Sequence, residues 1–457
     1  MVSSRRLFLK RAMGAAVITA LCGGTRQALA AGSSVFSEQR FTVKNVKRTT
    51  VRLEYRETPR RSMDRELPHW RYGELCEVTL ASGDTGVGET MLYYTWGVPD
   101  DDDIKRVIGR NALEVMWDDS LGAGLQMGLF DAVGRAAGVP VHALLGRQVH
   151  NTTPLSWWNI DTSAKDMASE CQLAHRTGYM SYKTKGRPWF DIFEQLEAST
   201  QNLPEAFKID MDFNDTLLTA ERGMHIIKGL EKYPHVDIYE TPIPQGDVEG
   251  NRKIVEASRV NVAMHYGTPS PSIVAKTRCC DGFVVGGGAS RVMEAGRFAG
   301  EVEMPFWLQL VGAGLTAAFS LHFGGVLQQA RWPAVNCHQL FEKDLLAQPI
   351  KVKSGHAKVP DKPGIGYEID WDLVNKLKVE KPPSRPEPER LIETTWADGS
   401  RMYTASNGTV NFMLNAGQKG VYPYFEKGAD TRLVPDDGTE AWKELYRKAR
   451  ASGPVKA

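Results

Sequence analysis

The feature that most constrains the fold is a regular alternation of short apolar strands and helical stretches from Trp157 to about residue 340. The expected strand ends follow one another at intervals of 20 to 30 residues. They are Asn159, Lys185, Asp210, Glu240, Tyr266, Gly286, Gln309 and Asn336. Eight strand–helix units at this spacing fit a closed barrel better than an open sheet. We therefore predict an α/β fold with a (β/α)8-type barrel over residues 151–340.

An N-terminal α+β domain is predicted over residues 41–150. Residues 41–43, 50–53 and 75–80 have strand-like composition. Apolar residues from Leu125 to Ala137 share one face of a helix that ends at Gly138. A loop rich in arginine and aromatic residues is expected between the second and third strands.

The chain continues beyond the barrel with two further segments. We predict a closing segment over residues 341–380 and a C-terminal extension over residues 381–457. The extension opens on a proline-rich linker and contains two hairpin signals, Asp398-Gly399 and Asn407-Gly408, before a final charged helix. No function for the extension follows from its sequence.

Residues 1–30 have the pattern of a twin-arginine signal peptide. Arg5 and Arg6 stand in the sequence SRRLFLK, an apolar stretch follows, and residues 28–30 form an A-x-A cleavage site. The apolar stretch is too short to span a bilayer. A chance basic N-terminus is the alternative interpretation. We expect recognition by the twin-arginine export machinery, delivery to the periplasm and no membrane attachment after cleavage.

The charge balance bears on the partners. With 56 Lys and Arg against 55 Asp and Glu, the formal net charge is +1, which gives no electrostatic reason to expect nucleic acid. We expect a small anionic substrate and a homo-oligomer. Candidates to recognise an anionic, ring-bearing substrate are Arg60, Arg61, Arg65, Trp70, Tyr93, Tyr94 and Trp96. The alternative is an ordinary solvated loop.

Two lysines mark the end of the second expected barrel strand. Lys183 and Lys185 are two residues apart, so strand alternation sends both side chains into the barrel interior. Crowding by other cations lowers the pKa of a lysine towards that of a useful base. Alternatively, both ammonium groups are solvated at a surface strand end.

Acidic residues end the next two expected strands. Asp210 and Glu240 are hard oxygen donors on neighbouring strands, which suits Mg²⁺. Such a metal would polarise a substrate carboxylate and stabilise an enediolate while a lysine removes the α-proton. Alternatively, the acids pair with the lysines in a structural ion network.

Together these motifs resemble the mandelate racemase/muconate lactonizing branch of the enolase superfamily. The resemblance rests on Lys183-x-Lys185, Asp210, Glu240-x-Pro-x-Pro and segments 123–146 and 359–366. It implies an α+β capping domain, a divalent metal and abstraction of a proton α to a carboxylate. It also implies Lys185 as the base, Lys183 as the group that polarises the carboxylate, and Asp210 and Glu240 as metal ligands. We add Asp212, Asn214 and Gln309 as candidate substrate-binding residues.

The sequence also departs from the family pattern. Tyr266 stands where the third acidic ligand is expected, and a neutral phenol is a poor Mg²⁺ ligand, whereas neighbouring His265 would suit a softer metal. Both are retained as candidate third ligands. Gly286 and Gln309 replace the usual second proton-transfer groups. One-sided chemistry is therefore favoured over racemisation.

We expect an exported lyase or isomerase acting on a hydroxy or sugar acid. Dehydration is the favoured reaction, because it needs one strong base and a general acid, and epimerisation is the second. The alternative function is a metal-free barrel that binds a ligand or runs different chemistry.

Overall fold

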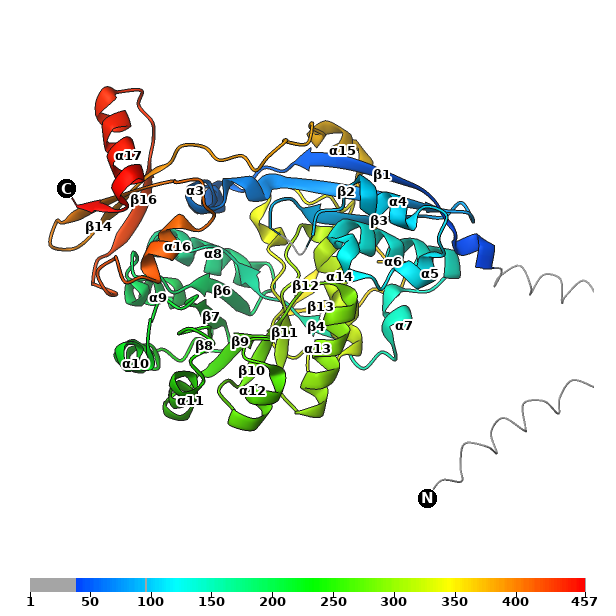
Figure 1. Cartoon of the computed structure of the whole chain (residues 1–457). Helices are drawn as coiled ribbons and strands as arrows, with labels where there is room; N and C mark the ends of the chain where they lie inside the picture. The colour runs from blue at the N-terminus through cyan, green and yellow to red at the C-terminus, as the bar shows by residue number, and fades with distance from the viewer. Residues whose placement is uncertain (1–37, 95–96, 457) are drawn as a thin grey trace, which may run out of the picture.

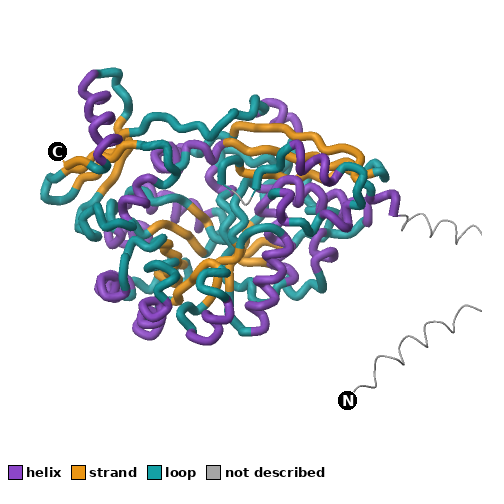
Figure 2. Tube along the Cα trace, viewed as in Figure 1, coloured by secondary structure: helices purple, strands orange, loops and turns teal. Residues whose placement is uncertain are grey.

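The computed structural model describes residues 38–94 and 97–456. Parallel strands curl into most of a barrel, surrounded by helices (Figures 1 and 2). In sheet order the strands are β11 (Phe306–Leu308), β10 (Gly282–Val285), β9 (Asn261–His265), β8 (Val236–Glu240), β7 (Lys208–Asp212), β6 (Ser181–Lys185) and β5 (Trp157–Trp158). The predicted α/β barrel is therefore confirmed.

The eighth barrel position is occupied by an extended segment. Ala334 forms an isolated parallel bridge with Leu155, and its carbonyl accepts a hydrogen bond from the Ser156 amide. On the other side, the Val335 amide donates to the Leu308 carbonyl. The strand expected to end at Asn336 is thus reduced to bridges that close the gap between β11 and β5.

The outer helices follow the strands in alternating order. They are α8 (Ala164–Arg176), α9 (Ile192–Thr200), α10 (Ala220–Leu230), α11 (Val248–Ala257), α12 (Pro271–Thr277), α13 (Ala289–Glu301) and α14 (Gly314–Val326). Side chains of Ser163, Asp191, Thr219 and Asp247 cap four of them by accepting backbone N–H hydrogen bonds. α14 is buried on nearly every side, because it lies between the barrel and the N-terminal domain.

Strand register determines which side chains reach the upper rim of the barrel. Lys185 and Glu240 end β6 and β8, as predicted. β7 ends at Asp212 instead of Asp210, since Asp212 is the residue paired with both Lys185 and Glu240. Similarly, β9 ends at His265, one residue before Tyr266.

The N-terminal domain packs a three-stranded antiparallel sheet against a helix. Its strands are β1 (Val43–Arg52), β2 (Tyr72–Leu80) and β3 (Thr85–Met91), and the helix is α6 (Ala123–Ala137). Gly138 ends α6 in the left-handed conformation, which glycine adopts without steric cost. The two strands expected over 41–43 and 50–53 are parts of one strand, β1.

The segment predicted as an arginine-rich loop is largely helical. It contains α3 (Glu57–Glu66) and a 3-10 turn, η2 (Pro68–Arg71). Shorter elements of this domain are η1 (Glu38–Phe41), α4 (Asp101–Val107), α5 (Ala112–Val115), η3 (Asp119–Leu121) and α7 (Val141–Leu145). β12 (Val352–Lys353), β13 (His356–Lys358) and β4 (Thr152–Pro154) form a small antiparallel sheet. η4 (His338–Leu340) contacts β5, and α15 (Trp371–Leu377) contacts β1.

The C-terminal extension forms a second small sheet with two helices. The sheet order is β16 (Asp430–Val434), β14 (Leu391–Thr395), β15 (Arg401–Ala405) and β17 (Val455–Lys456). The predicted hairpin at Asp398-Gly399 joins β14 to β15. The turn at Asn407-Gly408 leads instead into α16 (Phe412–Gly417), and α17 (Glu440–Ser452) is the predicted final helix. In Figure 1, α16 lies near α8 and α9, at one side of the barrel.

Within the described residues, no helix has the length and apolar character needed to cross a membrane.

Candidate active site

A cavity of about 190 Å³ opens at the carboxyl ends of the barrel strands. One part of its wall is apolar or aromatic and includes Leu67, Trp70, Tyr94, Trp158 and Ile160. Another part is ionic and includes Lys183, Lys185, Arg187, Asp212 and His265. In barrels of this type, the carboxyl ends of the strands are where catalytic groups are found.

The two lysines of β6 pair with different carboxylates. Lys183 forms an ion pair with Glu240 and donates a hydrogen bond to Gln309 Oε1 at 2.9 Å. Lys185 forms an ion pair with Asp212 and donates to Asn214 Oδ1 at 3.2 Å. The Lys183 side chain is 2% exposed and that of Lys185 is 14% exposed, so Lys185 is the more accessible amine.

Electrostatics distinguish the two amines further. Burial lowers the pKa of Lys185, and the neighbouring charges of Lys183 and Arg187 add to this effect, although Asp212 opposes it. Burial alone would also lower the pKa of Lys183, but Glu240 and Asp212 raise it above its ordinary value. Lys185 is therefore the easier of the two to deprotonate, while Lys183 keeps its positive charge.

His265 ends β9 and lies beside Glu240 in the wall of the cavity. Its Nε2 lies 3.0 Å from Glu240 Oε1, and its side chain is about half exposed. Tyr266 turns away: its ring packs against Phe283 and Phe298 and lines a different cleft. The candidate ligand role of Tyr266 is therefore wrong, because successive side chains at a strand end point in opposite directions.

Asp210 lies one layer below the cavity. It accepts a hydrogen bond from Ser181 Oγ at 3.0 Å, and burial raises its pKa to about 8. The residue that faces the cavity is Asp212, two positions further along β7. The assignment of Asp210 to the same rim as Glu240 must therefore be corrected to Asp212, since alternation places both aspartates inside the barrel but at different depths.

These donors do not fit a Mg²⁺ ion well. Asp212 and Glu240 are each already paired with a lysine, and His265 supplies nitrogen where Mg²⁺ prefers oxygen. Among the residues that the structure describes, no three His, Cys, Asp or Glu side chains are grouped so as to hold a metal ion. Of the ion network that was the alternative interpretation for Asp210 and Glu240, the Lys183–Glu240 pair is present, whereas Lys185 pairs with Asp212 and Asp210 accepts a hydrogen bond from Ser181.

The arginines predicted to bind substrate lie elsewhere. Arg60 pairs with Glu342 and Arg61 with Asp166, and both line a separate surface groove between α3, α8 and β16. Contrary to the prediction, neither arginine reaches the candidate active site, because the segment forms the helix α3 and directs both side chains to the surface groove. Trp70 does reach the site, where its ring stacks on Trp158 at a centroid distance of 5.5 Å.

Other candidates from the same region have different outcomes. Tyr94 lines the cavity and lies 4.5 Å from the Trp70 ring, whereas the Tyr93 hydroxyl donates to the Pro382 carbonyl. Trp96 lies outside the described residues, as does the predicted signal peptide. Asp212, Asn214 and Gln309 all line the cavity.

Several lining residues were not anticipated from the sequence. Arg187 continues the alternation of Lys183 and Lys185, and its guanidinium donates to Asn214 Oδ1 at 2.6 Å. That K-x-K-x-R spacing was the available signal. Asn411 and Leu414 come from the C-terminal extension, and no local pattern connects them to the barrel.

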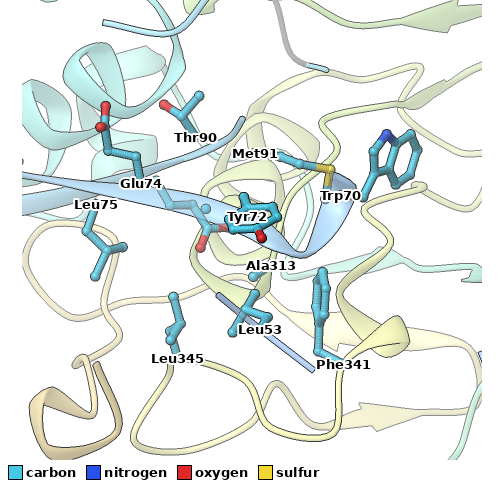
Figure 3. Close-up of a pocket in the computed structure, with 12 residues that line it drawn as sticks. Leu53, Trp70, Tyr72, Glu74, Leu75, Thr90, Met91, Ala313, Phe341 and Leu345 are labelled. Carbon is cyan, nitrogen blue, oxygen red and sulfur yellow. The ribbon is translucent and has the colours of Figure 1, made fainter. Parts of the chain in front are cut away.

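A second cavity lies behind Trp70 and is shown in Figure 3. Apolar side chains that include Leu53, Leu75, Met91 and Phe341 surround it. Its volume of about 10 Å³ offers room for about one water molecule. It is therefore too small for an organic substrate, and the cavity above β6 and β7 is the candidate active site.

Comparison with known proteins identifies related sequences and folds. Residues 166–373 match a family model described as Enolase C-terminal domain-like. Arabinonate dehydratase of Saccharolobus solfataricus is 23% identical over 342 residues, which cover 66% of this chain and 89% of that protein. N-succinyl-L-Arg/Lys racemase of Bacillus cereus is 20% identical over 302 residues, covering 60% and 79% respectively.

The fold has close counterparts among solved structures. Muconate cycloisomerase from Pseudomonas fluorescens superimposes with a TM-score of 0.60 at 19% identity. The match covers 74% of this chain and 99% of that chain.

Proposed function

We propose that this protein is a lyase or isomerase that removes the proton α to a carboxylate of a hydroxy or sugar acid, a proposal supported by the match of residues 166–373 to the Enolase C-terminal domain-like family model. The observation that carries the proposal is the division between two lysines on one strand. Lys185 has a lowered pKa and faces the cavity, whereas Lys183 has a raised pKa and lies deeper. A base and a fixed positive charge are thus held side by side.

The two lysines would act at different atoms. Neutral Lys185 accepts the α-proton at Nζ, and the electron pair of the C–H bond moves towards the carboxylate carbon. The Lys183 ammonium stabilises the negative charge that develops on the carboxylate oxygens. Gln309 and Asn214 position the two amines through the hydrogen bonds to Lys183 and Lys185.

Dehydration is the reaction that this arrangement favours. The enediolate electrons form the carbon–carbon double bond as the β-hydroxyl leaves, and a proton delivered to that hydroxyl releases water. We assign the proton donor to His265, because it lines the cavity and lies against Glu240. The ends of β10 and β11 carry Gly286 and Gln309, neither of which transfers protons, so a second base for racemisation is missing from those positions.

A divalent metal remains a prediction from the family resemblance. Asp212, Glu240 and His265 fit Mg²⁺ poorly, so we favour neutralisation of the substrate carboxylate by Lys183.

The second candidate function is a barrel that binds an acid without turning it over. The observation that favours it is the pairing of both carboxylates with lysines, which leaves a self-contained ion network.

Solvent exchange of the α-proton would test the proposed chemistry. The purified protein would be incubated in D₂O with hydroxy acids and sugar acids, and deuterium at the α-carbon would be followed by NMR. We expect exchange or dehydration with at least one acid, and loss of both in Lys185→Ala. Binding of an acid without exchange would identify the non-catalytic alternative.

We also propose that the protein is exported through the twin-arginine pathway to the periplasm and assembles as a homo-oligomer. Support for export comes from Arg5, Arg6 and the A-x-A site. Replacing both arginines by lysine should retain the precursor in the cytoplasm, as measured by cell fractionation. Light scattering on the mature protein would test the oligomeric state.

A further inference from the structure

Two residues of the C-terminal extension line the candidate active site. Asn411 immediately precedes α16 and Leu414 lies within it, and both border the cavity that contains Lys185. Leu414 is partly buried, whereas Asn411 is exposed and its side-chain amide makes no hydrogen bond to any residue that the structure describes. The extension therefore adds one apolar and one free polar group to the cavity wall.

α16 is fixed to the loop that follows β7. Gln418 Nε2 donates to the Asn214 carbonyl at 3.0 Å, and the Asn214 side chain accepts from Lys185 Nζ. Gly417 allows this approach: a Cβ atom there would lie 2.8 Å from the ring of Trp189. Asn214 therefore links Gln418 of the extension to the amine of Lys185, which we propose as the base.

The extension is also attached on two other sides. Arg390 Nη1 donates to the carbonyls of Arg65 and Glu66 in α3, at 2.8 and 3.0 Å. These residues directly precede Leu67, which lines the cavity. Thr431 Oγ1 donates to the Trp189 carbonyl at 2.8 Å, in the loop after β6. With both the N-terminal domain and the barrel as anchors, Asn411 and Leu414 are held in place at the cavity.

The chemistry of the lining indicates the kind of substrate. Three basic side chains, Lys183, Lys185 and Arg187, face two carboxylates, Asp212 and Glu240. The surplus basic group can pair with one substrate carboxylate. The aromatic and aliphatic part of the wall, to which Leu414 belongs, matches an apolar substrate group.

We propose that the C-terminal extension is a wall of the substrate site and that Leu414 and Asn411 select the end of the substrate remote from its carboxylate. The preferred substrate class is a monocarboxylic 2,3-dihydroxy acid with a ring-bearing tail, because the proposed dehydration needs a hydroxyl on the β-carbon. The position of the carboxylate in this scheme rests on the proposed function of Lys183 and Lys185. The family match ends at residue 373, so this wall lies outside the matched region.

A matched pair of acids would test the selection. 3-Phenyllactate and lactate share the same carboxylate and 2-hydroxyl but differ by a phenyl ring, and because both lack a β-hydroxyl they report binding and α-proton exchange without dehydration. Binding of each to the full-length mature protein would be measured by isothermal titration calorimetry. We expect wild type to prefer 3-phenyllactate and Leu414→Ala to reduce its affinity about tenfold, the scale of a lost apolar contact in a pocket, with little change for lactate. Leu414→Trp should fill the space and exclude the ring.

Two control variants lie in the same part of the extension. Asn415→Ala alters an exposed residue of α16 and Val421→Ala an exposed residue after it, and neither lines the cavity. Both should bind the two acids as wild type does, and circular dichroism would establish that all variants are folded. Asn411→Ala should change the affinity for the longer acid more than Asn415→Ala does.

The results separate this inference from the proposed chemistry. If wild type does not distinguish the two acids, or if the Leu414 variants change binding of both equally, the wall does not select the substrate and the inference is overturned. If the ring preference depends on Leu414 but no acid exchanges its α-proton, the wall is upheld and the carbon-acid function fails. Lys185→Ala should abolish exchange while keeping the ring preference.

Discussion

Lys183 and Lys185 stand two residues apart on β6, and each forms an ion pair with a different carboxylate, Glu240 for the first and Asp212 for the second. Burying such pairs brings little net stability, because desolvation offsets much of the attraction. Their position at the floor of a cavity is therefore better explained by function than by folding.

The rate of α-proton exchange should rise with pH. Lys185 must be neutral to accept a proton, and burial with the charges of Lys183 and Arg187 lowers its pKa from 10.5. The rate should therefore increase as pH rises through a midpoint below 10.5. Lys185→Ala should lower the rate about 10²- to 10⁴-fold, the usual contribution of a general base. A rate in Lys185→Ala equal to that of wild type would contradict the assignment.

Asp212 and Asp210 should respond differently to the same substitution. Asp212 raises the pKa of Lys185, so Asp212→Asn should move the midpoint of the pH–rate profile to lower pH. Asp210 lies below the cavity, and Asp210→Asn should leave that midpoint in place. The measurement is the pH–rate profile of each variant. Equal shifts of the midpoint in both variants would contradict the assignment of Asp212, and not Asp210, as the carboxylate that acts on Lys185.

Removing the charge of Lys183 should destabilise the fold. Lys183→Met leaves Glu240 buried without its main partner, at a cost of about 3–5 kcal/mol in the free energy of unfolding. The double variant Lys183→Met/Glu240→Gln should recover part of this loss in urea unfolding. Lys228→Met is the control, because the Lys228–Glu231 pair is exposed on the lysine side and is worth less than about 1 kcal/mol. Similar losses in both single variants would disprove the prediction.

Glu89 should make the protein less stable at high pH. Burial raises its pKa from 4.5 to about 7, although the Thr316 amide donates to its carboxylate at 2.8 Å. Because the folded-state pKa is raised, the contribution of Glu89 to stability is full below pH 4.5 and is lost as pH rises through 7. The free energy of unfolding of Glu89→Gln should therefore exceed that of wild type by about 1–3 kcal/mol at pH 8 and equal it at pH 4. Urea unfolding at the two pH values is the measurement, and a difference that does not depend on pH would refute it.

Mg²⁺ should not be retained stoichiometrically. Both candidate carboxylates are paired with lysines, and the third position holds His265. After incubation with millimolar Mg²⁺ and desalting, we expect elemental analysis to find much less than one ion per chain. Thermal unfolding should also be insensitive to Mg²⁺. One ion per chain, lost in Glu240→Gln, would restore the metal site that the family resemblance implies.

The barrel could be predicted because its signal is local and repeated. Each strand–helix unit carries its own apolar pattern, so the strand ends at Lys185 and Glu240 were located correctly. The choice between Asp210 and Asp212 was ambiguous, since both face inwards and only the register with β6 and β8 shows which one reaches the rim. His265 and Tyr266 presented the same difficulty at the end of β9.

Other parts of the site depend on contacts between distant segments. The segment of α3 was expected to be a loop because it is rich in charged residues. It forms a helix, and its charged side chains form ion pairs with neighbouring elements, such as Arg61 with Asp166. Leu414 reaches the site although it lies more than 200 residues beyond the end of β7 in sequence. No pattern within that extension reveals which surface it covers.

The hydrogen bonds from Arg390 to α3 and from Thr431 to the loop after β6 add to the direct contacts between the N-terminal domain and the barrel, such as the Arg61–Asp166 ion pair. Because the extension is bonded to both, it connects the N-terminal domain to the barrel at the edge of the cavity. Ligand entry would then require small local rearrangements near the opening rather than separation of two lobes. The extension would thereby slow ligand exchange as well as shape the cavity, and its loss would shorten the residence time of a bound acid.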